Sequence, residues 1–224
     1  MSILRGIVQA PTNISFSDGD DVNIICGKQA ELLTSPMHSE LYSQTYRGYV
    51  FHASTTPLGL AIPIYTSTAP TVCLWNPIGS GRNLSIINIV FAYVSGTATY
   101  GAVGLSYVTV AGSTVATGSV FSAFGTGTPV NGIVGGGGVS AGRVAIAGTT
   151  TLTTSPTASN WFYTLGNINL EAATGTAHAT FVPGAGSNPK GSIIVPPGTA
   201  VWICCTIASS ALYAQTISWS EVPT

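Results

Sequence analysis

Short runs of β-branched and aromatic residues alternate with small polar residues along most of the chain, and Gly or Pro interrupts them every few residues. This period-two pattern predicts β-strands joined by turns, with one face of each strand buried. We expect strands at 21–26, 48–53, 59–65, 71–75, 84–94, 97–112, 144–152, 161–170, 179–183, 192–195, 200–208 and 212–222. Together they predict an all-β fold, an antiparallel two-sheet sandwich of jelly-roll-like type.

Helical patterns are confined to KQAELLTSPMHSELYSQTY, residues 28–46. Ala30–Leu33 and Ser39–Gln44 each predict one or two short helical turns, and Pro36 separates them. Eight of the thirteen charged residues lie within residues 1–47. We therefore expect an irregular, polar N-terminal arm or edge segment at 1–47 and a β-sandwich body at 48–224.

The stretch LWNPIGSGRN, residues 74–83, predicts a tight turn between two strands. Proline starts such a turn because its φ is fixed near about −65°, and Gly79 and Gly81 supply positive φ values. We interpret the stretch as a rigid hairpin corner over which Trp75 can fold. Arg82 can reach a carboxylate or carbonyl of a neighbouring chain, or it only keeps the loop solvated.

Two further glycine- or proline-rich stretches of the body predict a turn and a loop. Pro196-Pro197-Gly198 predicts a tight connection between the two sheets. The segment 125–142 contains four consecutive glycines but no GKS or GKT, so a nucleotide-binding loop is disfavoured. We interpret it as a long flexible loop that is ordered by packing against something else.

Charged residues make up only 6% of the chain, against about 25% in an average globular protein, and the net charge is −1. Free soluble domains rely on surface charge to stay dispersed, so we expect partners to cover much of this surface. A neutral chain attracts neither nucleic acid nor anionic lipid, and we expect neither as a partner.

Membrane insertion and export are not indicated. The N-terminus MSILRGIVQAPTNISF lacks the apolar run of a signal peptide, and no stretch reaches 18 apolar residues. A membrane β-barrel is disfavoured because regular aromatic girdles are missing. The four cysteines, Cys26, Cys73, Cys204 and Cys205, have no zinc-site spacing. We expect buried, reduced thiols, with Cys204 and Cys205 on opposite faces of one strand.

No constellation of catalytic residues is evident. Glu171 and His178 fall close enough to be neighbours across a turn, but no GxSxG motif accompanies them. The cluster Asp18–Asp21 fits either a calcium ion or a plain polar turn. We therefore predict no enzyme activity, no cofactor and no metal. The consecutive aromatics at 161–163 either pack in the core or stack on sugars.

The stretches LWNPIGSGRNLSIINIVFAYVSGT and IIVPPGTAVWI resemble virion structural proteins of tailed bacteriophages, especially small β-sandwich cement or decoration proteins. The similarity covers mainly residues 56–110 and 190–220. It implies a homotrimer, or another homo-oligomer, made in the host cytoplasm and bound to the major capsid protein on the capsid exterior. It offers no catalytic residues to carry over.

From the charges and the corner we predict assembly contacts at Arg5, Arg47, Trp75 and Arg82. The alternative function is a glycan-binding or structural module of a tail fibre, spike or minor tail component. In that case Trp161, Tyr163 or Trp75 would recognise host glycans. A head–tail connector component is a further structural possibility.

Overall fold

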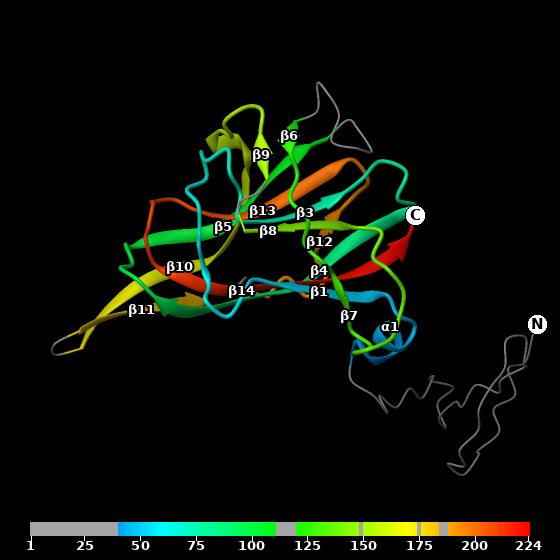
Figure 1. Ribbon diagram of the computed structural model, residues 1–224, viewed down its shortest axis with the longest axis horizontal. Helices are drawn as coiled ribbons and strands as arrows, with labels where there is room; N and C mark the ends of the chain where they lie inside the picture. Colours follow the sequence, from blue (N-terminus) through cyan, green and yellow to red (C-terminus); the bar gives the residue numbers. More distant parts are fainter. Residues whose placement is uncertain (1–39, 111–119, 148–149, 174–175, 184–187) are drawn as a thin grey trace, which may run out of the picture. The chain divides into compact units, whose positions relative to one another are not determined.

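The computed structural model describes residues 40–110, 120–147, 150–173, 176–183 and 188–224. Contacts within the chain define two units, Met1–Ser43 and Gln44–Thr224. The expected strand at 21–26, the helical turn at 30–33 and the residues Arg5, Asp18–Asp21 and Cys26 lie outside the described residues. The second unit carries the fold (Figure 1).

The described chain is almost entirely β-structure. It contains one short α-helix, α1 (Tyr42–Tyr46), and one 3₁₀ turn, η1 (Ala158–Asn160). The strands are β1 (Val50–Ser54), β2 (Leu60–Ala61), β3 (Val72–Asn76), β4 (Arg82–Ser95), β5 (Gly101–Thr109), β6 (Phe121–Ala123), β7 (Val130–Asn131), β8 (Arg143–Ile146), β9 (Thr151–Leu152), β10 (Trp161–Ala173), β11 (Thr176–Pro183), β12 (Ile193–Val195), β13 (Thr199–Cys205) and β14 (Leu212–Pro223). The predicted all-β fold is confirmed.

The strands form two antiparallel sheets packed as a sandwich, as the sequence predicts. The β14 sheet has the order β12-β4-β14-β1-β7, with β2 paired to β14, and the β13 sheet has the order β11-β10-β5-β13-β3-β8. In Figure 1, β1, β4 and β14 form the lower layer, and β3, β5 and β13 form the upper layer. A small third ladder joins β6 to β9 above the β13 sheet.

Consecutive strands often change sheets. The chain crosses between the sheets from β3 to β4, from β4 to β5, from β12 to β13 and from β13 to β14. The interpretation of LWNPIGSGRN as a hairpin is therefore wrong, because β3 pairs with β13 and β8 whereas β4 pairs with β14 and β12. The turn connects the two layers, as the Pro-Pro-Gly turn between β12 and β13 also does.

Two apolar clusters occupy the molecule, one on each face of the β13 sheet. The first lies between the sheets and includes Leu105, Ile203 and Trp219. The second lies on the opposite face and includes Phe121 of β6 and Trp202 of β13. Every residue of β13 after Thr199 is buried, because both faces of this strand are covered. This explains the unbroken apolar run AVWICC, which is typical of strands buried on both sides.

Strand boundaries differ from the predictions where the chain changes direction. The expected strand 144–152 is divided into β8 and β9, and Ala147 between them has a φ of +77°. The expected strand 59–65 reduces to β2, since Pro63 cannot donate to a sheet ladder. The short strands β6 and β7 lie in segments where no strand was predicted.

Candidate association surface

The two predicted turns meet at one side chain, Asn76 at the end of β3. Its Nδ2 donates hydrogen bonds of 2.8 Å to the carbonyl oxygens of Arg82 and Val195. The backbone carbonyl oxygen of Asn76 accepts a hydrogen bond from the Gly198 amide at 2.8 Å. The predicted positive φ is confirmed at Gly79 and Gly81, with values of +82° and +65°. Asn76 thus ties together the two connections that join the sheets.

Trp75 does not fold over this turn. Its side chain is fully buried in the second apolar cluster, with ring centroids 5.5 Å from Phe121 and 5.2 Å from Phe124. The Arg143 guanidinium covers it at 5.1 Å from the ring centroid. Because no part of this ring reaches the surface, we withdraw Trp75 from the predicted assembly contacts and from the glycan-binding alternative.

The predicted arginine contacts have different surroundings. Arg82 lies against its own chain, with its guanidinium carbon 5.3 Å from the Tyr49 ring centroid. Its Nη1 is buried and has no hydrogen-bond partner among the described residues. Arg47 follows α1 and is exposed. Contacts of Arg47 and Arg82 with a neighbouring chain stay predictions, and Arg5 lies outside the described residues.

The glycine-rich loop 125–142 is fixed by a buried carboxylate that sequence reasoning did not single out. Glu221 of β14 accepts hydrogen bonds from Ser140 Oγ at 2.5 Å, from the Ala141 amide at 2.9 Å and from the Gly142 amide at 3.3 Å. Asn131 in the same loop donates to the Gly48 carbonyl at 2.8 Å. The loop therefore packs against β1 and β14 of its own chain.

One side of the sandwich is formed by the outward face of the β14 sheet. We define this outward face by the residues His52, Ser54, Val90, Ala92, Val94, Ala214, Thr216 and Ser218 of β1, β4 and β14. Their neighbours in the alternation, such as Phe51, Ile89 and Ile217, point into the first apolar cluster. The outward face carries no charged side chain.

Polar groups on the outward face are largely paired with one another. His52 Nδ1 and Ser218 Oγ are 2.8 Å apart, and Ser54 Oγ and Thr216 Oγ1 are also 2.8 Å apart. Burial lowers the pKa of His52 below its ordinary value of 6.5. Val90, with 48% of its surface exposed, adds an apolar group.

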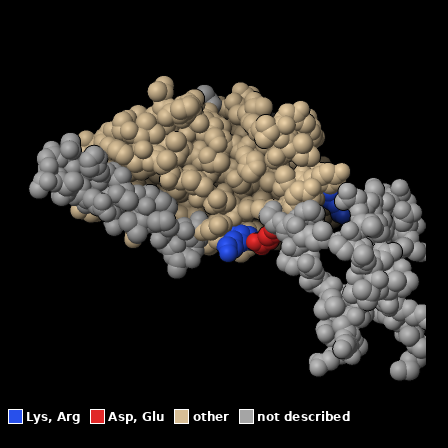
Figure 2. All heavy atoms as spheres, turned by 90° about the horizontal axis from the view of Figure 1, so that it is seen from below, with Lys and Arg blue, Asp and Glu red and all other residues tan. Residues whose placement is uncertain are grey.

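Figure 2 views the molecule from the side of β1, β4 and β14 and shows how charge is distributed there. Most of the described surface in this view is uncharged, and the few charged atoms lie near its border. A charge loses its hydration when a partner covers it, which costs free energy. A face without charges therefore has a smaller desolvation cost on burial.

Acidic residues and histidines are sparse among the described residues. No group of three or more His, Cys, Asp or Glu residues is placed to hold a metal ion within the described ranges. The backbone register pairs Glu171 of β10 with His178 of β11, which places the two as neighbours across the turn. Across the same ranges, no helix is long and apolar enough to cross a membrane.

Comparisons with known proteins add no relative. A scan against family models, a search of curated proteins and a search of solved structures each return no match to this chain.

Proposed function

We propose that this protein is a structural component of a larger assembly and that it binds its neighbours through the outward face of the β14 sheet. The observation that carries the proposal is the absence of charge from this face, in a chain with only thirteen charged residues in 224. An isolated domain with such a surface lacks the repulsion that normally opposes association.

The energetics of the outward face favour repeated, individually weak contacts. Stable pairwise interfaces use about 20–30 residues on each side, which is more than the outward face supplies. Many copies on one scaffold make weak contacts effective, because each bound contact raises the local concentration for the next. Copies of one chain carry the same charges, so a neutral face avoids like-charge repulsion between the copies of a homo-oligomer.

The resemblance of LWNPIGSGRN and the PPGT turn to tailed-phage virion proteins supports a phage capsid as the assembly in this proposal. We propose a cement or decoration protein that binds the major capsid protein on the exterior of the capsid, as a homotrimer or another homo-oligomer. The alternative, a structural module of a tail fibre, spike or minor tail component, uses the same neutral face against a different neighbour.

The test uses shells of the cognate phage assembled without this protein. Wild-type protein is expected to co-sediment with the shells and to raise the temperature at which they rupture. Val90→Lys places a charge on the outward face and should weaken shell binding at least about tenfold, because the ammonium must be desolvated. Val134→Lys is the matched control, since Val134 is 90% exposed in the glycine-rich loop and is not one of the residues that define the outward face.

Two results would contradict the proposal. The first is wild-type protein that stays in solution beside the shells and leaves their rupture temperature unchanged. The second is equal shell binding by Val90→Lys and Val134→Lys, which would place the contact elsewhere on the chain. Binding to tails but not to shells would favour the tail alternative.

A further inference from the structure

Trp161, the first residue of β10, lies on the opposite side of the molecule from the outward face. Its indole ring lies directly on Gly104 of β5, where an added Cβ would come within 2.3 Å of the ring carbon Cζ2. Its Nε1 donates to Thr164 Oγ1 at 3.4 Å. The glycine therefore lets the ring lie close to the β13 sheet, and the hydrogen bond helps to fix its orientation.

A hollow of about 240 Å³ opens beside this ring, lined by Tyr65, Ala158, Trp161 and Thr206. Tyr65 meets Trp161 edge to face, with ring centroids 6.5 Å apart. The backbone amide of Tyr65 donates to the carbonyl of Cys205 at 2.8 Å, which anchors Tyr65 to the end of β13. Two aromatic rings are thus held at a fixed angle at the edge of a small cavity.

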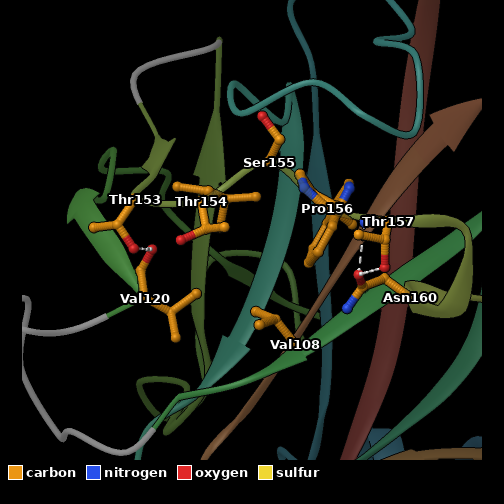
Figure 3. A pocket seen from close by; sticks show the side chains of 10 residues that line it. Val108, Val120, Thr153, Thr154, Ser155, Pro156, Thr157 and Asn160 are labelled. Carbon is orange, nitrogen blue, oxygen red and sulfur yellow. Dashed lines mark hydrogen bonds between the residues drawn. The ribbon is translucent and has the colours of Figure 1, made fainter.

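A second hollow of about 270 Å³ also borders η1, through Asn160, and is shown in Figure 3. Val108 and Val120 contribute apolar surface to it, and Trp202 lines it with only 2% of its surface exposed. The segment 153–157 forms a rim of hydroxyl groups. Among the described residues, no hydrogen bond joins the side-chain hydroxyl of Thr154 or Ser155 to another protein group. Both residues are exposed, so these two hydroxyls are available to a ligand.

The remaining polar groups of the rim are oriented by the chain itself. Asn160 Oδ1 accepts the Thr157 amide at 2.8 Å and lies 3.1 Å from the Thr157 hydroxyl, while Asn160 Nδ2 donates to the Tyr107 carbonyl at 3.0 Å. Figure 3 shows Thr157 and Asn160 facing each other at one end of the hollow. The end of the rim at Thr157 and Asn160 is therefore fixed before any ligand arrives, which reduces the entropic cost of binding there.

We propose that these two hollows form one aromatic cleft, which binds a neutral carbohydrate. We use the name aromatic cleft for the two hollows, whose sugar-facing residues are Tyr65, Trp161, Thr206, Thr154 and Ser155. Aromatic rings offer a flat apolar surface to the C–H face of a sugar ring, and the free hydroxyls of the rim bond to sugar hydroxyls. Each hollow is smaller than the roughly 300–1,000 Å³ of pockets for drug-sized ligands, so one sugar ring suits each.

The absence of charge around the aromatic cleft narrows the class of ligand. None of the residues that line either hollow is Lys, Arg, Asp or Glu. Phosphorylated ligands, nucleic acids and acidic sugars need cationic partners that this cleft does not provide. A lipid or a purely apolar ligand would leave the hydroxyl rim unused. A neutral oligosaccharide satisfies both the rings and the rim.

The test is a glycan array containing neutral and acidic oligosaccharides, followed by calorimetric titration with maltose, cellobiose and N,N′-diacetylchitobiose. The wild-type chain is expected to bind neutral sugars only. Trp161→Ala should weaken binding at least about tenfold, as expected for the loss of a central tryptophan contact. Thr154→Val removes one hydroxyl without changing shape and should weaken binding about two- to tenfold.

Phe162→Ala is the matched control, because Phe162 is an exposed aromatic neighbour of Trp161 that lines neither hollow. It should bind sugars as the wild type does. Thermal unfolding of each variant separates loss of the fold from loss of the site, and Thr154→Val keeps the test decisive if Trp161→Ala is unstable. Shell binding should be unchanged in both cleft variants, so the two proposals fail independently.

Several outcomes would overturn the aromatic cleft. These are the absence of binding to any neutral sugar, binding restricted to acidic sugars, and equal affinity in the wild type and in both Trp161→Ala and Thr154→Val. Binding of a proline-rich peptide at Trp161, with no sugar binding, would assign the cleft to a different class of ligand.

Discussion

The two outer faces of the sandwich differ in whether further residues cover them and in the kinds of side chain they carry. The outward face of the β14 sheet is built from small, uncharged residues whose hydroxyl groups pair across strands. The outer face of the β13 sheet instead supports a second apolar cluster with Trp75 and Trp202 fully or almost fully buried. One sheet therefore has a single buried face and the other has two.

This difference explains the sequence patterns of the two sheets. In β4 the exposure of the residues alternates from Ile89, which is buried, to Val94, which is exposed. In β13 alternation disappears because Trp202 and Ile203 point into different apolar clusters. A flat neutral face suits a broad contact with another protein, whereas a covered face with aromatic rings at its rim suits a small ligand.

Replacement of Trp202 by Ala should have the largest effect, because it removes a buried indole ring from the second cluster. We expect the free energy of unfolding to fall by about 3–5 kcal/mol, the usual cost of truncating a buried tryptophan. Val90→Ala on the outward face should cost less than about 0.5 kcal/mol. Urea denaturation of both variants measures the difference. Similar losses in the two variants would mean that the outer face of the β13 sheet is not a core.

Glu221→Gln should have the next largest effect. The carboxylate accepts hydrogen bonds from Ser140, Ala141 and Gly142, and an amide replaces one acceptor oxygen by a donor. We expect a loss of about 1–3 kcal/mol and faster amide hydrogen exchange in the loop 132–142. Glu40→Gln is the control, since Glu40 is exposed. Unchanged exchange in the loop would show that the carboxylate does not hold it.

Thiol labelling tests whether both faces of the β13 sheet are covered. Cys204 points into the second apolar cluster and Cys205 into the first, as predicted for adjacent strand residues. Burial raises the pKa of Cys204 to about 12 and that of Cys205 to about 11. In a Cys26→Ser background, Cys73, Cys204 and Cys205 should react with iodoacetamide only after unfolding, since the thiolate is the reactive form. Rapid native-state labelling of Cys204 alone would show that its face is open.

The smallest effect concerns His52 on the outward face. Because burial lowers its folded-state pKa below 6.5, the unfolded chain binds this proton more tightly. The contribution of His52 to stability is therefore fully present above about pH 6.5 and is lost as the pH falls through the folded-state pKa. Unfolding free energies of the wild type and His52→Gln, measured from about pH 5 to pH 7, should show a steeper rise with pH in the wild type. Parallel curves would contradict this assignment.

Strand positions follow from local pattern, and most of them could be predicted from the sequence. The segment 71–75 became β3, 192–195 became β12, and 212–222 became β14, each within one residue of the expected bounds. Periodicity does not determine which strands pair, so the turn after Trp75 was taken for a hairpin although it joins two sheets. The second apolar cluster was not predicted either. It includes Phe121 of β6, and a strand of only three residues is too short to give a periodic pattern.

The candidate sites were harder to predict for the same reason. Gly104 supports the Trp161 ring across strands, and Glu221 reaches a loop about 80 residues away in the sequence. Both contacts join residues that are far apart in the chain, so neither produces a recognisable pattern in the local sequence. The neutrality of the outward face, in contrast, follows from composition, because a chain with 6% charged residues has few charges to place there.

Site-specific labelling of the outward face tests the central claim most directly. Ala92→Cys places a thiol on the exposed face of β4, and Val134→Cys places one in the glycine-rich loop, both in a Cys26→Ser background. Both thiols should react rapidly in the isolated protein. In assembled particles, Ala92→Cys should become protected at least about tenfold while Val134→Cys stays reactive. Equal reactivity of Ala92→Cys in free and assembled protein would contradict an association through this face.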